Sequence, residues 1–297
     1  MFIMKVLKNF RVIARNFTAF LGIVSTIPLN GEPIGVRAEV LAADAVENTL
    51  FIRHEAVEDG LPAGERQVKV GRGDALNGYL NRKIRGNLIT SEGLWRLEKI
   101  WPVDPQGDKI LADINRQLRR DTVTRGRKVY RAVGEYSPSF ALYNQMGEVV
   151  QFTQLQGKYV VLNFIFTRCA VPTMCPAATA NMGRLQQQAR EVGIEDLELV
   201  SISFDPEYDT PGILRNYAEI HGLDLANFNL LTGPKQAIDD IMTQFGILTV
   251  EEDGTINHTM ATLLIDRKGR IIFRREGSRW SYKDFIERLE ALSDQGT

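Results

Sequence analysis

The stretch Tyr159-Val-Val-Leu-Asn-Phe-Ile-Phe-Thr-Arg-Cys169-Ala-Val-Pro-Thr-Met-Cys175-Pro176 contains both cysteines of this 297-residue chain. Val160 to Phe166 is an almost unbroken apolar run rich in β-branched and aromatic residues, which is typical of a strand buried on both faces. The residues after Pro176, Ala177 to Glu191, favour a helix. The sequence therefore predicts a strand, a loop with two thiols, and a helix whose N-terminus can lower a thiol pKa.

The cysteine pair allows a structural disulfide, a redox pair or a soft-metal site. Two thiols in 297 residues are too few for a disulfide framework. A disulfide that closes so short a loop would restrict the unfolded chain little. We therefore favour redox chemistry or metal binding for Cys169 and Cys175.

The overall composition is that of a globular chain long enough for two domains, with 44% apolar and 25% charged residues. The formal net charge of −1 gives no reason to expect nucleic acid as a partner. No Walker or Rossmann glycine pattern occurs in the sequence.

Residues 1–31 form a signal-like or membrane-targeting segment. An apolar stretch, Phe17 to Ile27, follows the basic residues Lys5, Lys8, Arg11 and Arg15, a layout that resembles a secretory signal. The stretch is shorter than the roughly 20 residues of a spanning helix. We expect an exported, periplasmic protein, with a membrane anchor or an amphipathic helix of a cytoplasmic protein as the alternatives.

Residues 35–103 predict a small, mainly β domain, because short strands alternate with turn signals. The expected strands are 36–41, 49–54, 66–70, 84–89 and 94–101. An amphipathic helix, 107–120, and a run of arginines follow in residues 104–133. Such a charge run is usually a solvated linker.

Residues 134–297 predict a layered α/β domain with a mixed sheet flanked by helices. The expected strands include 197–204, 261–266 and 270–275, and the expected helices are 177–191, 211–221, 234–245 and 280–292. Thr210 is the expected N-cap of the second helix, with Pro211 at its first position. Asp205 and Asp209 are expected to turn the chain at a strand end, with a supporting role at the site open for Asp205.

The order of these elements resembles the thioredoxin fold, in which a thiol loop follows the first core strand and a late hairpin carries a cis-proline facing the thiols. Ala261 stands at the expected proline position, and His258 lies three residues upstream. The resemblance thus implies an imidazole near the two thiols.

Five elements in order are similar to the Sco/SenC family of thioredoxin-like copper proteins. They are Phe164-Ile-Phe-Thr-Arg-Cys169, Met174-Cys175-Pro176, Asp205-Pro206-Glu-Tyr-Asp209-Thr210-Pro211, Phe245-Gly246-Ile247 and His258. The resemblance implies an exported chaperone that binds copper through Cys169, Cys175 and His258. Its implied partner is the copper-site subunit of cytochrome c oxidase or another copper protein. Thiolates suit Cu(I), and imidazole adds a third ligand.

The chain departs from the family's usual pattern, which places three residues between the cysteines, whereas this chain has five. The longer loop can still bring the thiols together, but it changes the ligand geometry and offers the Met174 thioether. Arg168 and the helix N-terminus are candidates to balance the charge of a copper–thiolate site.

The segment from Ile52 to Ala63 is similar to part of the small OB-like copper-carrier domains sometimes fused to Sco-like proteins. Those domains bind copper through methionines, and no methionine lies between Met4 and Met146 here. We therefore interpret residues 35–103 as a relative that has lost its thioether ligands. By itself, His54 is more often a strand residue whose ring is hydrogen-bonded than a metal ligand.

The functional hypothesis is a copper chaperone, and the enzyme alternative is a thiol–disulfide oxidoreductase that reduces a partner's cysteines through Cys169 and Cys175. A thiol peroxidase is the weakest alternative, because Thr167-Arg168-Cys169 does not by itself establish a peroxide site. Met182 and Trp280 are expected to pack in the core.

Overall fold

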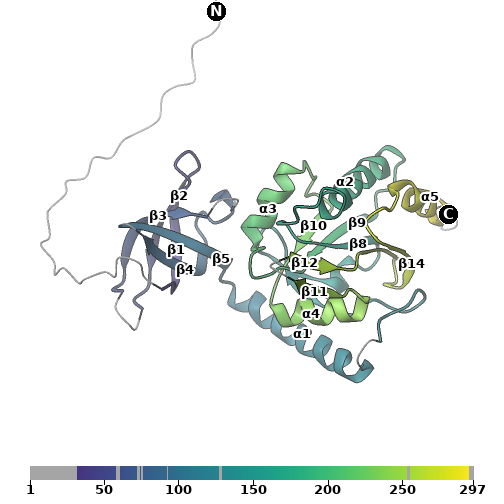
Figure 1. The fold of residues 1–297 in the computed structure, drawn as a ribbon, viewed down its shortest axis with the longest axis horizontal. Helices are drawn as coiled ribbons and strands as arrows, with labels where there is room; N and C mark the ends of the chain where they lie inside the picture. The colour runs from purple at the N-terminus through teal and green to yellow at the C-terminus, as the bar shows by residue number, and fades with distance from the viewer. Residues whose placement is uncertain are drawn as a thin grey trace, which may run out of the picture.

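The computed structural model describes residues 32–57, 61–71, 74, 76–91, 93–126, 129–252 and 255–293, without the side chains of residues 77 and 249–258. The predicted signal-like segment 1–31 lies outside the described residues. None of the described helices is both long enough and apolar enough to cross a membrane. Figure 1 shows two bodies joined by a long helix.

The first body is a closed five-stranded barrel with the strand order β1-β2-β3-β5-β4. Its strands are β1 (Ile34–Asp44), β2 (Thr49–His54), β3 (Gly64–Val70), β4 (Lys83–Ser91) and β5 (Leu94–Pro102). The pairing of β3 with β5 is parallel, and β5 also pairs with β4 to close the barrel. Alternate apolar side chains fill the interior, among them Val40, Ile52 and Leu97, which are fully buried.

Helix α1 (Pro105–Arg125) leads out of the barrel and packs against helix α4 (Lys235–Phe245). Four arginines of the basic run form ion pairs: Arg116 with Asp113, Arg119 with Asp240, Arg125 with Glu135, and Arg131 with Asp121. The interpretation of this run as solvated fails for Arg125 and Arg131, whose side chains are mostly buried, whereas the Arg119 side chain is exposed. α1 also extends beyond the predicted helix at both ends, because Asp104 caps it and its later turns contact α4.

The second body is built on a five-stranded mixed sheet in the order β10-β9-β8-β13-β14. Its strands are β8 (Tyr159–Ile165), β9 (Leu197–Ser203), β10 (Phe228–Leu231), β13 (Ala261–Ile265) and β14 (Ile271–Glu276). β8, β9 and β10 are parallel, and β13 is antiparallel to both of its neighbours. Every residue of β8, β9 and β13 is buried, which explains their continuous apolar runs.

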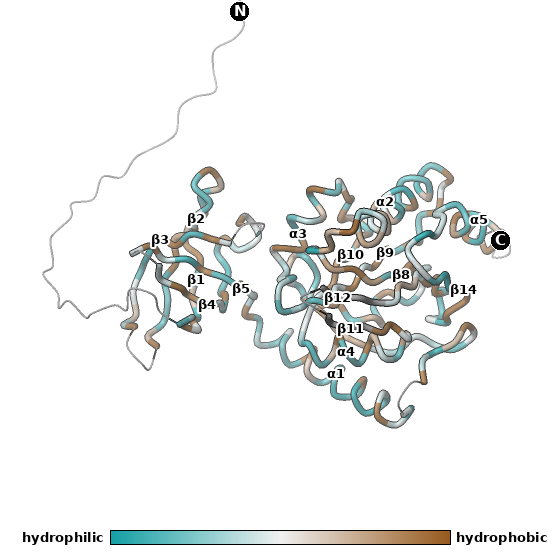
Figure 2. Tube along the Cα trace, viewed as in Figure 1, coloured by the Kyte–Doolittle hydropathy of each residue, from teal (hydrophilic) through white to brown (hydrophobic). Residues whose placement is uncertain are grey.

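Helices cover this sheet on both sides. α2 (Cys175–Glu191) packs against α5 (Tyr282–Ser293), and α1 and α4 lie on the other side of the sheet (Figure 1). α3 (Pro211–Ile220) lies on the side of the barrel. The strands of the sheet are largely hydrophobic in Figure 2, whereas α1 alternates between hydrophilic and hydrophobic stretches. The predicted α/β class with a smaller, mainly β N-terminal part is confirmed.

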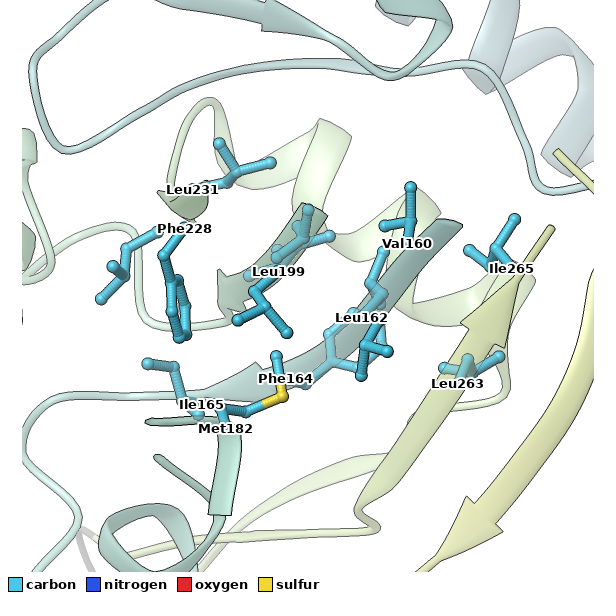
Figure 3. Close-up of a cluster of buried hydrophobic side chains, with 14 of the residues drawn as sticks. Val160, Leu162, Phe164, Ile165, Met182, Leu199, Phe228, Leu231, Leu263 and Ile265 are labelled. Atoms are coloured by element: carbon cyan, nitrogen blue, oxygen red, sulfur yellow. The ribbon is translucent and has the colours of Figure 1, made fainter. Parts of the chain in front are cut away.

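The core between sheet and helices is drawn in Figure 3. Met182 of α2 points toward Phe164 and Leu199, which come from neighbouring strands. Met182 is fully buried and Trp280 is 5% exposed, so both pack in the core as predicted.

Two short hairpins complete the fold. β6 (Ala141–Tyr143) pairs with β7 (Val149–Gln151), and β11 (Thr249–Glu252) pairs with β12 (Thr255–His258). The second hairpin is absent from the strands predicted from the sequence.

The barrel contacts the second body directly. The Tyr79 hydroxyl donates to Asp74 Oδ1 at 2.6 Å and also lies beside the Gly212 backbone in the first turn of α3. Arg82 donates to the carbonyl oxygens of Met146 and Gly147. Hydrogen bonds of this kind orient the barrel on the α3 side of the sheet.

Candidate metal centre

The cysteine loop leaves the carboxyl end of β8. The Cys169 amide donates to the Phe166 carbonyl at 3.3 Å, and the Met174 amide donates to the Val171 carbonyl at 3.0 Å. α2 begins at Cys175 itself, with Pro176 in its first turn, where a missing N–H costs nothing. The loop thus consists of two tight turns, and Cys175 belongs to the helix.

The two thiols are brought together. Cys175 is fully buried, and its thiol interacts with the Cys169 thiol and with the Phe166 backbone. Cys169 is half-buried. The longer spacing between the cysteines therefore does not separate them.

The Cys175 thiol is held in its protonated form. Burial, with a smaller contribution from Cys169, raises its pKa from 9.0 to about 12. The expectation that the helix N-terminus lowers a thiol pKa is wrong for Cys175, because desolvation outweighs the backbone hydrogen bonds that favour the thiolate.

Arg168, next to Cys169, forms an ion pair with the Asp205 carboxylate. Its Nε and Nη2 donate to Asp205 Oδ2 at 3.0 and 2.6 Å, and its guanidinium lies 4.5 Å from the centre of the Tyr208 ring. The predicted charge-balancing cation is thus already paired. Asp205 follows β9 and fixes the residue that precedes Cys169.

Asp209 fixes the start of the cysteine loop, a role that sequence reasoning missed. Its side chain is fully buried and accepts hydrogen bonds from the Thr167 amide at 3.1 Å, the Thr167 hydroxyl at 2.5 Å and the Ser203 hydroxyl at 2.5 Å. Burial raises its pKa from 3.8 to about 6, against the opposing effect of these hydrogen bonds. The expected turn at the strand end is present, since the Asp209 amide donates to the Asp205 carbonyl at 2.8 Å.

Tyr217 of α3 is a second residue that the sequence did not indicate. Its hydroxyl lies 2.8 Å from the Thr179 hydroxyl of α2. Burial raises its pKa to about 12, and Cys175, Asp209 and Cys169 all lie close enough to add to that shift. No motif distinguishes Tyr217, because in the sequence it is one more apolar position of an amphipathic helix.

The structure describes only the backbone of His258. This residue ends β12, opposite Thr249, three residues before β13. β13 runs antiparallel to β8, so it enters the sheet at the edge where β8 ends and the cysteine loop begins. The three-ligand set Cys169, Cys175 and His258 stays a prediction, because the His258 side chain that would complete it lies outside the described part of the structure.

His54 in the barrel is occupied by hydrogen bonds. Arg66 Nε donates to His54 Nε2 at 2.9 Å, so Nδ1 carries the proton and donates to the Glu55 carbonyl at 3.0 Å. The ring has no free nitrogen, and the interpretation of His54 as a satisfied strand residue is confirmed.

Comparison with known proteins matches this architecture. The family model described as SCO1/SenC matches residues 129–293, more than half of the chain. The chain belongs to the SCO1/SenC family. The family predicted from the sequence is confirmed, and the matched region contains the cysteine loop and β12.

Relatives and solved structures agree with this assignment. The SCO1 protein homolog of Bacillus subtilis (strain 168) is 30% identical over 159 residues, which are 52% of this chain and 81% of that protein. A protein of Stutzerimonas stutzeri, named for a proposed copper-binding role, is 30% identical over 45% of this chain and 66% of its own. The crystal structure of a SCO1/SenC family lipoprotein from Bacillus anthracis str. Ames is 32% identical, with a TM-score of 0.50, and covers 56% of this chain and 99% of that one. The thioredoxin-like fold of the second body follows from this likeness.

Proposed function

We propose that this SCO1/SenC protein is an exported chaperone that binds copper through Cys169, Cys175 and His258. It would deliver the copper to the copper-site subunit of cytochrome c oxidase or to another copper protein. The observation that carries the proposal is the contact between the two thiols at the carboxyl end of β8. Thiolates are soft ligands that suit Cu(I), and a neutral imidazole completes a three-coordinate set.

Several features support this proposal. β12 ends at His258, close in sequence to the strand that pairs with β8. The Stutzerimonas stutzeri relative is named for copper binding. The Bacillus anthracis relative is called a lipoprotein, which agrees with export, as does the basic and apolar pattern of residues 1–31.

Copper must displace a proton at this site. Because the pKa of Cys175 is about 12, the metal-free thiol is protonated at neutral pH, and Cu(I) binding releases that proton. Affinity then falls about tenfold for each pH unit on acidification, for this proton alone.

The second candidate function is thiol–disulfide exchange with a partner protein, because two free thiols in contact can form a disulfide. Cys169, the more accessible thiol, would be the attacking one, since burial keeps Cys175 protonated. A reductase of this kind does not need His258, which separates the two functions.

The test is an anaerobic Cu(I) titration of the reduced full chain against a chromophoric chelator. We expect one tightly bound Cu(I), lost in Cys169→Ser, Cys175→Ser and His258→Ala. His54→Gln is the matched control, because both ring nitrogens of His54 are hydrogen-bonded within the barrel, so the substitution should leave Cu(I) binding unchanged. Weak binding by the unaltered protein, or full binding by His258→Ala, would overturn the three-ligand site and make the dithiol potential the next quantity to measure.

A further inference from the structure

The barrel has a groove on the face formed by β1, β4 and β5. It encloses about 850 Å³. The lining residues are Gly35 to Arg37, Glu55 to Val57, Arg85 to Asn87, Lys99 and Trp101; we call this the barrel groove. The groove carries three basic side chains and one carboxylate, Glu55, so its net charge is positive.

Arg37 and Arg85 stand directly opposite each other on neighbouring antiparallel strands. Both are exposed, and like charges in that position destabilise a sheet. Neither forms an ion pair with any residue that the structure describes, whereas Arg53, Lys69 and Arg96 of the same barrel all do. The repulsion between these two guanidinium groups opposes folding, and a bound anion would reduce that repulsion.

Lys99 enters the groove through a β-bulge. The register between β4 and β5 shifts from Arg85↔Trp101 to Asn87↔Glu98, so β5 carries one extra residue opposite Gly86. Lys99 takes a left-handed backbone, with φ of +51°, which is uncommon for a residue other than glycine. The bulge turns Lys99 outward beside the outward-facing Glu98, as the burial pattern of β5 shows.

Lys99 also lines a second cavity of about 410 Å³, whose other walls come from the thioredoxin-like body. Those walls include Arg168, Tyr208 and Lys235, with Asp205, Glu207 and Asp239 as the acidic members. Arg168 and Lys235 are paired with Asp205 and Asp239. The side chain of Lys99 thus links the barrel groove to the residue that precedes Cys169.

We propose that the barrel groove binds an acidic, extended segment of the protein that exchanges copper with Cys169. The inference rests on the proposed function, because it names the chemistry of the partner at that site. The unpaired cations attract carboxylates, and the groove leads toward the cysteine loop. Single-stranded nucleic acid fits less well, because it needs several stacking faces and Trp101, the aromatic residue of the groove, packs edge-on against Tyr143.

The test is fluorescence anisotropy of a labelled decapeptide of alternating Glu and Gly, titrated with the full chain at low salt. We expect binding that weakens as salt rises. Arg37→Gln/Arg85→Gln should weaken it about tenfold. Lys99→Gly should weaken it about threefold without destabilising the barrel, since glycine adopts the left-handed backbone at no steric cost.

The matched control is Lys69→Gln/Arg96→Gln, which removes the same charge from barrel residues that are ion-paired and do not line the groove. Equal affinity in all variants, no binding tighter than about 1 mM, or tighter binding of an oligothymidylate than of the peptide would each overturn the proposal. Cu(I) titration of the same proteins separates the two proposals. If the unaltered protein does not bind Cu(I), the proposed copper function is wrong. The peptide titration tests separately whether the barrel groove binds an acidic segment.

Discussion

At the scale of single residues, burial decides the protonation of the groups around the cysteine loop. Cys175 and Asp209 are both fully buried, and the pKa of each is raised although hydrogen bonds oppose the shift. Desolvation disfavours the charged form of a thiol and of a carboxyl group alike. At neutral pH the metal-free Cys175 is therefore protonated, whereas Asp209, with a pKa of about 6, is mostly ionised. A cation bound by Cys175 would have to displace the proton of that thiol.

Asp209 gives this loop a pH-dependent stability. A pKa raised from 3.8 to about 6 means that the folded state binds the proton more tightly than the unfolded state. The contribution of Asp209 to the free energy of unfolding is then largest below about pH 4, and about 3 kcal/mol of it is lost as the pH rises through 6. We expect Asp209→Asn, which does not titrate, to gain about 3 kcal/mol relative to the unaltered protein over this range.

Urea unfolding at several pH values measures that difference. Asp239→Asn is the control, because Asp239 is a partly exposed surface residue paired with Lys235. A pH-independent difference between Asp209→Asn and the unaltered protein would show that the pKa of Asp209 is the same in the folded and unfolded states, which would contradict the raised value.

At the scale of elements, the amide of Gln244 holds α1 against α4. Gln244 is fully buried; its Nε2 donates to the Thr122 hydroxyl at 2.9 Å, and its Oε1 accepts from Arg131 Nε at 2.6 Å. Gln244→Leu would leave a buried arginine N–H without its acceptor, so we expect a loss of about 2 kcal/mol. Urea unfolding with an unchanged slope would measure the loss, and Gln236→Leu, exposed on the same helix, should change stability by less than about 0.5 kcal/mol.

Elements that show a pattern in their own sequence were predictable. Features that depend on contacts with other parts of the chain were not. The apolar run of β8 predicted a buried strand, and the cysteine pair and the Asp205 to Pro211 segment predicted the family. The β11–β12 hairpin was missed because Thr249–Glu252 shows no apolar alternation. Tyr217 and Asp209 were missed as site residues because their roles come from contacts with other elements, Thr179 on α2 and Thr167 after β8.

At the scale of the whole molecule, the barrel and the thioredoxin-like body meet at the first turn of α3. Thr210 is the N-cap of this helix and Pro211 its first residue, as predicted, but the Thr210 side chain forms no capping hydrogen bond. The Asp74 carboxylate of the barrel lies against Gly212 instead, where a negative charge favours a helix N-terminus. The segment that carries Asp209 thus connects the barrel contact to the cysteine loop.

Gly212→Ala tests whether this contact holds the two bodies together. A Cβ at Gly212 would overlap the side chains of Asp74 and Tyr79, so the barrel would have to move away. Alanine should by itself stabilise α3 by up to about 1 kcal/mol, and any destabilisation must therefore arise at the interface. We expect calorimetry to show separate unfolding transitions for the barrel and the thioredoxin-like body, and small-angle scattering to show a larger radius of gyration. Gly183→Ala in α2, where a Cβ would meet only Leu223 at 3.4 Å, should keep the unaltered transition pattern. A Gly212→Ala protein with that same pattern and an unchanged radius would show that the two bodies do not depend on this contact.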